Sequence, residues 1–288
     1  MGRAKSNQKI DITIVGAGTL ATSLSAALRQ NGYRIDEVVS RDNAQSLRRT
    51  GALAKRVAAR PATFGTARFS ARMIWICVPD DAIEEVARLI ADRRDWSGKI
   101  VLHSSGAIGS TVLDSLKSRG ANIASAHPLM TFVNTSKRDL IGVPFALEGD
   151  SKALNVVAAV VRKLRGKPFR LDATLKPAYH AFGFFSSPAL VELIAAAQQA
   201  GKLAGLSKRK ATELMEPIVR QTIDNCFRNT PEQAFSGPLR RGDAATIRKH
   251  LEVLKQAPEA LEVYRALAHI GLRHLPVRKA AELKKLIG

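Results

Sequence analysis

The first half of the chain alternates between two patterns of hydrophobic and polar positions. Short runs of β-branched and other apolar residues, such as DITIV at 11–15 and MIWICV at 73–78, are typical of buried strands. Between such runs, apolar residues recur at helical spacing, as at Leu20, Leu24 and Leu28. Strands that alternate with helices of 10–15 residues indicate βαβ units and a mostly parallel sheet. We expect strands at 11–15, 35–40, 73–78, 99–104, 122–126, 144–148 and 167–171, a helix end and one short strand within 52–72, and helices within 16–32, 81–92 and 152–165, the last capped by Ser151.

The pattern changes after Asp172, where strand signals stop and helical periodicity continues nearly to the end. Ser187–Pro188 is typical of an N-cap followed by the first residue of a helix, so a kink or restart is expected there. Asp243 is expected to cap the helix that follows it. The sequence therefore predicts two domains, an α/β domain at 1–171 and an all-helical domain at 172–288.

Composition excludes some classes of protein. Two cysteines in 288 residues cannot form a disulfide framework, and a hydrophobic content of 45% is typical of a globular chain. No transmembrane segment is expected, because Pro188 and Glu192 interrupt the longest apolar stretch, 181–197. We therefore expect a cytoplasmic protein without a membrane partner.

The charge is large: 45 basic and 25 acidic residues give a net charge of +20. Such an excess suggests nucleic-acid binding, but no helix-turn-helix, zinc-finger or aromatic RNA-binding signature accompanies it. The basic residues are spread over both halves of the chain. We interpret the charge as a solvated surface, with a small part directed at an anionic cofactor and substrate, and expect no nucleic-acid partner.

The sharpest local motif is G-x-G-x-x-A, which follows the first predicted strand and opens the first predicted helix. A first glycine permits a tight turn, a second lets the backbone approach a pyrophosphate, and a small third residue lets the helix pack against the strand. The helix N-terminus then offers free N–H groups to phosphates. The motif predicts dinucleotide binding by Gly16, Ala17, Gly18, Thr19, Leu20 and Ala21.

The end of the second predicted strand indicates which dinucleotide binds. A free ribose 2′-hydroxyl requires an acidic residue about 20 positions after the motif. The chain instead has Ser40 and Arg41 there, and a guanidinium suits a 2′-phosphate. NADP is therefore predicted over NAD; in the alternative, Arg41 is a solvated loop residue and Asp42 binds the 2′-hydroxyl.

Further candidates follow the carboxyl ends of other predicted strands, where ligands of open α/β sheets bind. Val78 and Pro79 are expected to line the cofactor site. Histidine titrates near neutral pH, so histidines here are candidate proton donors; each could equally be a half-buried residue that packs a turn. No metal-binding spacing occurs. The candidates are Ser104 for the cofactor or substrate, Ser105 for orienting the substrate, His103 for binding it, and His127 for supplying a proton.

A series of motifs carries a resemblance over residues 10–275. The series is GAGTLA, VPDD, HSSGA, AHPLMTF, KPAYHA, GPLRRGD and YRALA. It resembles uncharacterised bacterial proteins with a Rossmann-like N-terminal domain and a helical C-terminal domain of unknown function, often labelled as NADP oxidoreductases of the deazaflavin-dependent type. More distantly, it is similar to pyrroline-5-carboxylate reductases, ketopantoate reductases and β-hydroxyacid dehydrogenases.

The resemblance implies a Rossmann domain followed by a helical domain of the 6-phosphogluconate dehydrogenase C-terminal type. It also implies a homodimer through the helical domain and an active site in the cleft between domains. In β-hydroxyacid dehydrogenases, a lysine on the first helix of the second domain donates the proton and an asparagine one turn later binds substrate. The matching positions here are Lys176 and His180, so the second departs from that pattern.

Together these features predict NADP-dependent hydride transfer to or from a small carbonyl, hydroxy-acid or imine substrate. Lys176, His180 or His127 would supply the proton, and Arg241 would bind the carboxylate of an anionic substrate. The alternative is a non-catalytic NADP(H)-binding sensor or regulatory protein.

Overall fold

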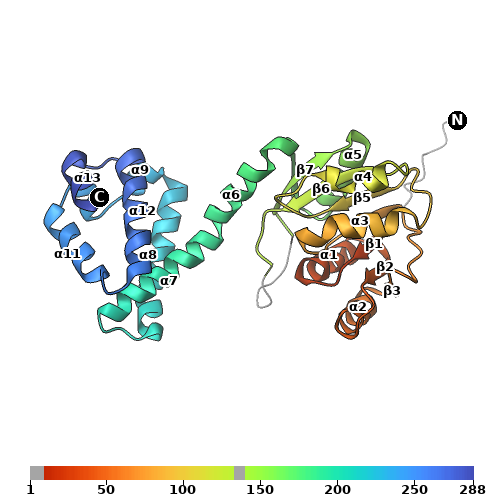
Figure 1. The fold of residues 1–288 in the computed structure, drawn as a ribbon, viewed down its shortest axis with the longest axis horizontal. Helices are drawn as coiled ribbons and strands as arrows, with labels where there is room; N and C mark the ends of the chain where they lie inside the picture. The colour runs from red at the N-terminus through yellow and green to blue at the C-terminus, as the bar shows by residue number, and fades with distance from the viewer. Residues whose placement is uncertain (1–9, 133–139) are drawn as a thin grey trace. The chain divides into compact units, whose positions relative to one another are not determined.

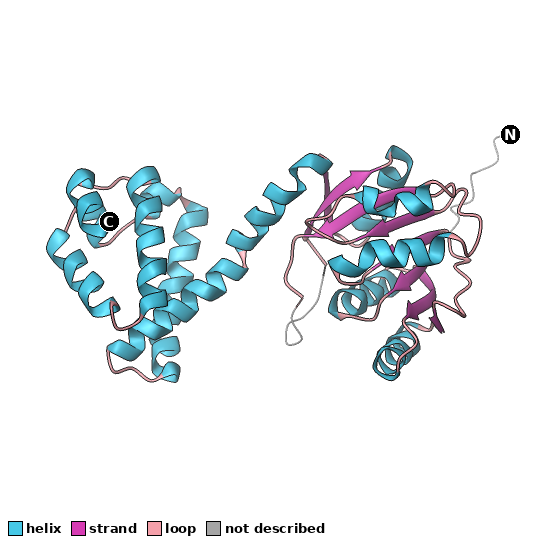
Figure 2. Ribbon diagram, in the orientation of Figure 1, coloured by secondary structure: helices cyan, strands magenta, loops and turns pink. Residues whose placement is uncertain are grey.

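The structure is a computed structural model that describes residues 10–132 and 140–288. The chain divides into two compact units, Met1–Phe184 and Phe185–Gly288. The first unit contains all the strands, and the second is helical in its described residues (Figures 1 and 2). The first unit extends twelve residues beyond Asp172, where the sequence pattern changes, and therefore includes most of helix α6 (Lys176–Ser186).

Eight strands of the first unit form one sheet in the order β3-β2-β1-β4-β5-β6-β7-β8. Neighbouring strands are parallel except β6 and β7, which run antiparallel. The strand order reverses between β1 and β4, so the crevice at their carboxyl ends is where a doubly wound sheet binds ligands. The strands are β1 Asp11–Val15, β2 Arg34–Ser40, β3 Arg60–Thr63, β4 Met73–Ile76, β5 Ile100–His103, β6 Asn122–Pro128, β7 Pro144–Gly149 and β8 Lys167–Arg170.

Helices cover both faces of this sheet. In β4, Met73 and Trp75 enter the core beneath α1, α2 and α5, while Ile74 and Ile76 enter the core beneath α3 and α4. Burial on both faces explains why the central strands are continuously apolar. The helical segments are α1 Thr19–Gln30, α2 Ala44–Val57, η1 Asp80–Ala82, α3 Ile83–Ala91, η2 Ser110–Leu113, α4 Asp114–Lys117, α5 Ser151–Lys163 and η3 Ala173–Leu175.

The structure confirms the mostly parallel sheet, and each predicted strand is present. The segment 52–72 supplies the end of α2 and the short strand β3, as expected. One detail of the prediction is wrong: Ser151 is the first residue of α5, and the N-cap is Asp150. The Asp150 side chain instead accepts from Ile123 N and pairs with Lys117, so it ties α5 to a neighbouring segment.

The second unit consists of helices packed around two small apolar clusters, one of which joins Ile247, Leu283 and Ile287. The helix restart at Ser187–Pro188 is confirmed, and Asp243 caps α11 by accepting from Thr246 N. The helices are α7 Pro188–Leu203, α8 Lys208–Arg228, α9 Pro231–Ala234, α10 Pro238–Arg241, α11 Ala244–Leu254, α12 Pro258–His274 and α13 Ala280–Ile287.

The segment Ala173–Leu203 is long and apolar enough to cross a membrane by length and composition alone, with a mean hydropathy of 1.3 in its most apolar window. No such segment was expected from the sequence. A single such segment is weak evidence for a membrane span, and none of its most apolar window is buried in this structure. Here the segment consists of three helical pieces, η3, α6 and α7, rather than one unbroken helix.

Candidate functional site

The turn between β1 and α1 requires glycine for two separate reasons. Gly16 has a φ of +107°, a conformation that residues with a side chain rarely adopt. Its N–H donates to Val39 O at 2.8 Å, which holds the turn beside β2. A Cβ at Gly16 would lie 2.4 Å from Cys77 O at the end of β4, so a side chain could not fit without moving that strand. The first motif glycine therefore lets β1 and β4 lie close together at the switch point.

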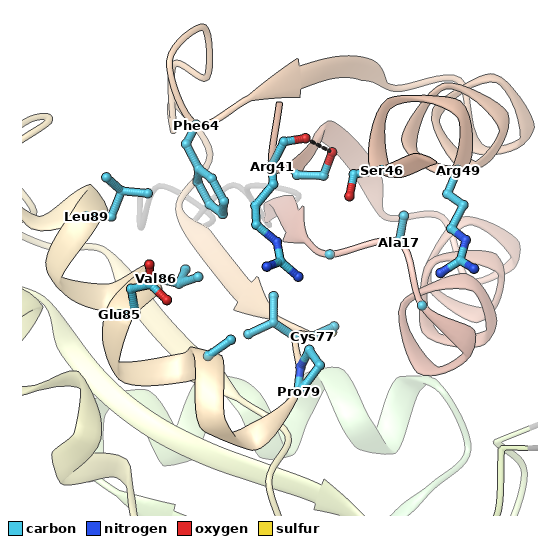
Figure 3. Close-up of a pocket in the computed structure, with 15 residues that line it drawn as sticks. Ala17, Arg41, Ser46, Arg49, Phe64, Cys77, Pro79, Glu85, Val86 and Leu89 are labelled. Atoms are coloured by element: carbon cyan, nitrogen blue, oxygen red, sulfur yellow. Dashed lines mark hydrogen bonds between the residues drawn. The ribbon is translucent and has the colours of Figure 1, made fainter. Parts of the chain in front are cut away.

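A pocket opens over this turn (Figure 3). Arg41 extends into it from the end of β2, Arg49 reaches it from α2, and Phe64 lies beside Arg41 on the side away from Arg49. Burial raises the pKa of the Cys77 thiol, so this thiol is uncharged at neutral pH. The lining comprises Gly16, Ala17, Gly18, Ser40, Arg41, Ser46, Arg49, Phe64, Cys77, Val78, Pro79, Ala82, Glu85, Val86 and Leu89.

The residues of this pocket fit a dinucleotide. No atom lies within 4 Å of a Cβ placed on Gly18, so the backbone there is open to a ligand. Gly18 is the N-cap of α1, whose first turn has no acidic residue to compete for its N–H groups. The two arginines add positive charge where an anionic group would lie. Asp42, the alternative ribose ligand, is not among the residues that line the pocket.

The loop after β5 uses its polar groups internally. Ser104 Oγ accepts from Trp75 Nε1 at 2.8 Å. Ser105 Oγ donates to Asp80 Oδ2 at 2.7 Å and accepts from Ala107 N and Ile108 N. These contacts give both serines a role in shaping the loop, and neither serine lines the pocket.

His103 is fully buried and bonded through both ring nitrogens. Its Nδ1 accepts from Ser105 N at 3.1 Å, so Nε2 carries the hydrogen and donates to Gly109 O at 3.2 Å. Burial, with a smaller effect of the Lys176 charge, lowers the pKa of His103 to about 4. The ring is therefore neutral at pH 7 and enclosed, although the sequence suggested it as a substrate ligand.

Lys176 is also enclosed, with a side chain only 1% exposed. Its Nζ donates to Ser105 O at 2.9 Å and to Ser125 Oγ at 2.7 Å, and lies 3.7 Å from Glu148 Oε1. Glu148 in turn accepts from the backbone and hydroxyl of Ser110. Burial lowers the pKa of Lys176, against the opposing effect of Glu148. The ammonium thus joins α6 to β6, to β7 and to the loop after β5.

A group of aromatic rings lies at the carboxyl end of β6. His127 Nδ1 lies 3.0 Å from the Tyr179 hydroxyl, and the two rings meet edge to face. His180 makes a second edge contact with His127. Gly106 makes room for them, because a Cβ there would lie 2.8 Å from both His127 Nε2 and His180 Cδ2. The loop after β5 therefore lies directly against this group, which we call the His127 cluster (His127, Tyr179 and His180).

Burial changes the acidity of two members of the His127 cluster. It lowers the pKa of His127 to about 4, with further lowering from the charges of Lys176 and His180. It raises the pKa of Tyr179 to about 12. At neutral pH the imidazole of His127 is therefore uncharged and the phenol of Tyr179 keeps its proton.

The structure distributes the predicted site residues over several places. Gly16, Ala17, Gly18, Ser40, Arg41, Val78 and Pro79 line the pocket, and Thr19, Leu20 and Ala21 form the first turn of α1. Arg241 ends α10 in the second unit, so its role as a substrate ligand stays a prediction. Arg49, Phe64 and Tyr179 were not among the site residues predicted from the sequence. Only Tyr179 had a signal, because it stands beside His180 in the KPAYHA motif. Within 10–132 and 140–288, no three His, Cys, Asp or Glu side chains gather as metal ligands would.

Comparison with known families assigns both parts of the chain. Residues 3–128 match the Rossmann-like domain, which defines the class of the first unit. Residues 143–270 match a domain of unknown function, DUF2520. A Rossmann-like match and a DUF2520 match thus follow one another along the chain, as the motif series indicated, and the second begins just before β7, within the first unit. A search of curated protein sequences finds no match.

Solved structures share the fold over nearly the whole chain. A protein from Bacteroides fragilis that is named as an NADP oxidoreductase is 24% identical, covering 91% of this chain and 97% of its own, with a TM-score of 0.76. A protein from Thermotoga maritima is 23% identical, covering 95% and 99%, with a TM-score of 0.70. An imine reductase from Myxococcus stipitatus, in complex with NADP+, is 15% identical, covering 96% and 100%, with a TM-score of 0.66.

Proposed function

We propose that this protein is an NADP-dependent oxidoreductase that transfers hydride to or from a small carbonyl, hydroxy-acid or imine compound. The observation that carries the proposal is the pocket over Gly16, where a glycine turn, an open helix N-terminus and two arginines meet. Similar structures from Bacteroides fragilis and Myxococcus stipitatus, named as an NADP oxidoreductase and an imine reductase, support it.

Each part of the pocket has a task in this proposal. The N–H groups at the start of α1 bind the pyrophosphate, because the helix N-terminus carries partial positive charge. Arg41 and Ser40 bind the 2′-phosphate, with Arg49 adding charge from α2. Val78 and Pro79, in the turn after β4, would contact the nicotinamide end of the cofactor. When bound, NADPH would supply the hydride. The chain binds and orients the cofactor and supplies the proton.

The cofactor assignment predicts a selective effect of Arg41→Ala. Loss of a charged hydrogen-bond partner costs about 1.5–3 kcal/mol, so NADPH affinity should fall about 10- to 100-fold while NADH affinity stays unchanged. Arg48→Ala is the matched control, because Arg48 is exposed on α2 but does not line the pocket. Fluorescence titration with both cofactors measures the effect. Unchanged NADPH affinity in Arg41→Ala would overturn the assignment.

Turnover tests the catalytic part of the proposal. NADPH oxidation is followed by absorbance with a panel of ketones, keto acids and cyclic imines. We expect oxidation that depends on one of these compounds. Tight NADPH binding without turnover on any member would contradict the enzyme proposal and favour the NADP(H)-binding sensor.

We also propose a homodimer through the helical unit. Its helices α7 and α8 expose large apolar side chains, among them Val191 at 66%, Ile218 at 62% and Phe227 at 87% exposed. Apolar patches of this kind are typical of protein–protein interfaces.

Light scattering should give twice the chain mass of 31.2 kDa for the wild type, and the double variant Ile218→Asp with Phe227→Asp should give the mass of the monomer. Leu47→Asp, at an exposed site on α2, is the control that should leave the mass unchanged; a monomeric wild type would refute the dimer.

A further inference from the structure

Several histidine and lysine side chains stand near the loop after β5, and the geometry decides which can reach a substrate. The reaction proposed above needs one proton for each hydride, so a donor must contact the substrate. His103 is fully buried with both ring nitrogens bonded, and the side chain of Lys176 is only 1% exposed. To touch a substrate, His103 would have to break its bonds within the loop after β5, and Lys176 would have to break the contacts that join α6 to the sheet. Their positions indicate that they hold the site together.

The His127 cluster remains, and within it the Tyr179 hydroxyl has a defined partner. It lies 3.0 Å from His127 Nδ1, at the carboxyl end of β6. Phe169 contacts the Tyr179 ring from β8, with the ring centres 6.0 Å apart. The phenol is therefore fixed in direction by rings from two strands. His180, which is exposed, has only its edge contact with His127 in this cluster.

We propose that Tyr179 is the proton donor of the proposed reaction and that His127 positions it and returns its proton. The inference rests on the proposed function. With the hydrogen of His127 on Nδ1, the ring donates to the phenol oxygen and leaves the Tyr179 hydrogen for the substrate. Gly106 contributes to this arrangement, because the absence of a side chain there lets the ring of His127 approach the loop after β5.

The proton transfer balances in a simple way. Hydride from NADPH forms a C–H bond at the carbon of a C=O or C=N group, and the π electron pair moves to oxygen or nitrogen. The O–H bond of Tyr179 breaks and its proton joins that atom. As the resulting phenolate takes the Nδ1 proton of His127, Nε2 of the same ring takes a proton from solvent, so the imidazole stays neutral. The phenol of Tyr179 keeps its proton throughout the neutral pH range, so it is protonated at the start of each turnover.

Tyr179→Phe removes only the hydroxyl and tests the proposal. We expect kcat to fall at least about 100-fold, as for loss of a general acid, while the Kd for NADPH stays unchanged. The chain offers a matched control: Tyr264 hydroxyl also lies beside a histidine, 3.3 Å from His250 Nδ1, with the rings edge to face. Tyr264→Phe removes an equivalent hydrogen bond from the helical unit and should leave kcat unchanged.

A second readout needs no turnover. The ring protons and nitrogens of His127, followed by NMR, should shift in Tyr179→Phe and not in Tyr264→Phe. The charged and titratable groups that act on His127, the partner of this phenol, are Lys176, His180 and Asp80. Unchanged His127 signals in Tyr179→Phe would show that the two side chains are not hydrogen-bonded and would overturn the proposal.

The outcomes separate the two proposals. Wild-type kcat in Tyr179→Phe would overturn the donor assignment and leave the oxidoreductase proposal standing. A wild-type protein that binds NADPH and turns over no substrate would overturn both. A fall in kcat with unchanged NADPH affinity and shifted His127 signals supports the donor assignment.

Discussion

Gly16→Ala is expected to reduce NADPH affinity at least about 100-fold. The Cβ would lie 2.4 Å from Cys77 O and 2.9 Å from Cys77 C, and the backbone at Gly16 has a φ of +107°. Both the contact and the strained backbone force β1 and β4 apart at the carboxyl edge where the pocket opens, and positive φ alone costs roughly 1–3 kcal/mol. Fluorescence titration with NADPH measures the loss.

The matched control for this substitution is Gly51→Ala. Gly51 lies inside α2, outside the pocket, and no atom lies within 4 Å of its added Cβ. Alanine in a helix interior is favoured over glycine by about 1 kcal/mol, so this variant should keep wild-type affinity and gain slightly in stability. Wild-type NADPH affinity in Gly16→Ala would show that the turn does not shape the cofactor pocket.

The second large effect is a loss of stability of the first unit in mild acid. The folded-state pKa of His103 is about 4, against the ordinary histidine value near 6.5. Between these values the unfolded chain binds more protons than the folded one, so the free energy of unfolding falls as pH falls from about 6.5 to 4. For this fully buried ring, the contribution amounts to roughly 3 kcal/mol at pH 4.

Chemical denaturation at pH 7 and pH 4.5 measures this effect. The chain's two tryptophans, Trp75 and Trp96, are both fully buried in the first unit, so their fluorescence reports on its unfolding. Because carboxylates also titrate in acid, the comparison is with His103→Gln, which should lose less stability over the same pH interval. His274→Gln, at an exposed position, should behave like wild type. Equal acid sensitivity of wild type and His103→Gln would contradict the prediction.

The candidate site shows why some residues could be found from the sequence and others could not. The glycine turn was predictable because its chemistry is local: each position of G-x-G-x-x-A has a requirement set by the strand before it and the helix after it. Ser40 and Arg41 were found by counting along the same unit. Arg49 and Phe64 reach the pocket from α2 and from beyond β3, and no spacing in the sequence brings them there.

The catalytic candidates show the same division more sharply. In the sequence, His103 and His127 were alike as titratable residues that follow predicted strands, and Lys176 was a candidate only through the resemblance. Packing separates them, since His103 and Lys176 are enclosed while His127 contacts a half-buried tyrosine. Tyr179 gains its significance only from a ring that is 52 residues away in the chain.

The sequence by itself determined the Rossmann-like sheet, the helical second half and the glycine turn, because these depend on local periodicity and on the steric demands of single residues. The tertiary structure decided which side chains meet. It placed β7 antiparallel, enclosed the Lys176 ammonium between Ser105, Ser125 and Glu148, and set Tyr179 against His127 over Gly106. Burial and partner contacts fix the acidity and reach of a titratable group, and both arise from residues far apart in the chain.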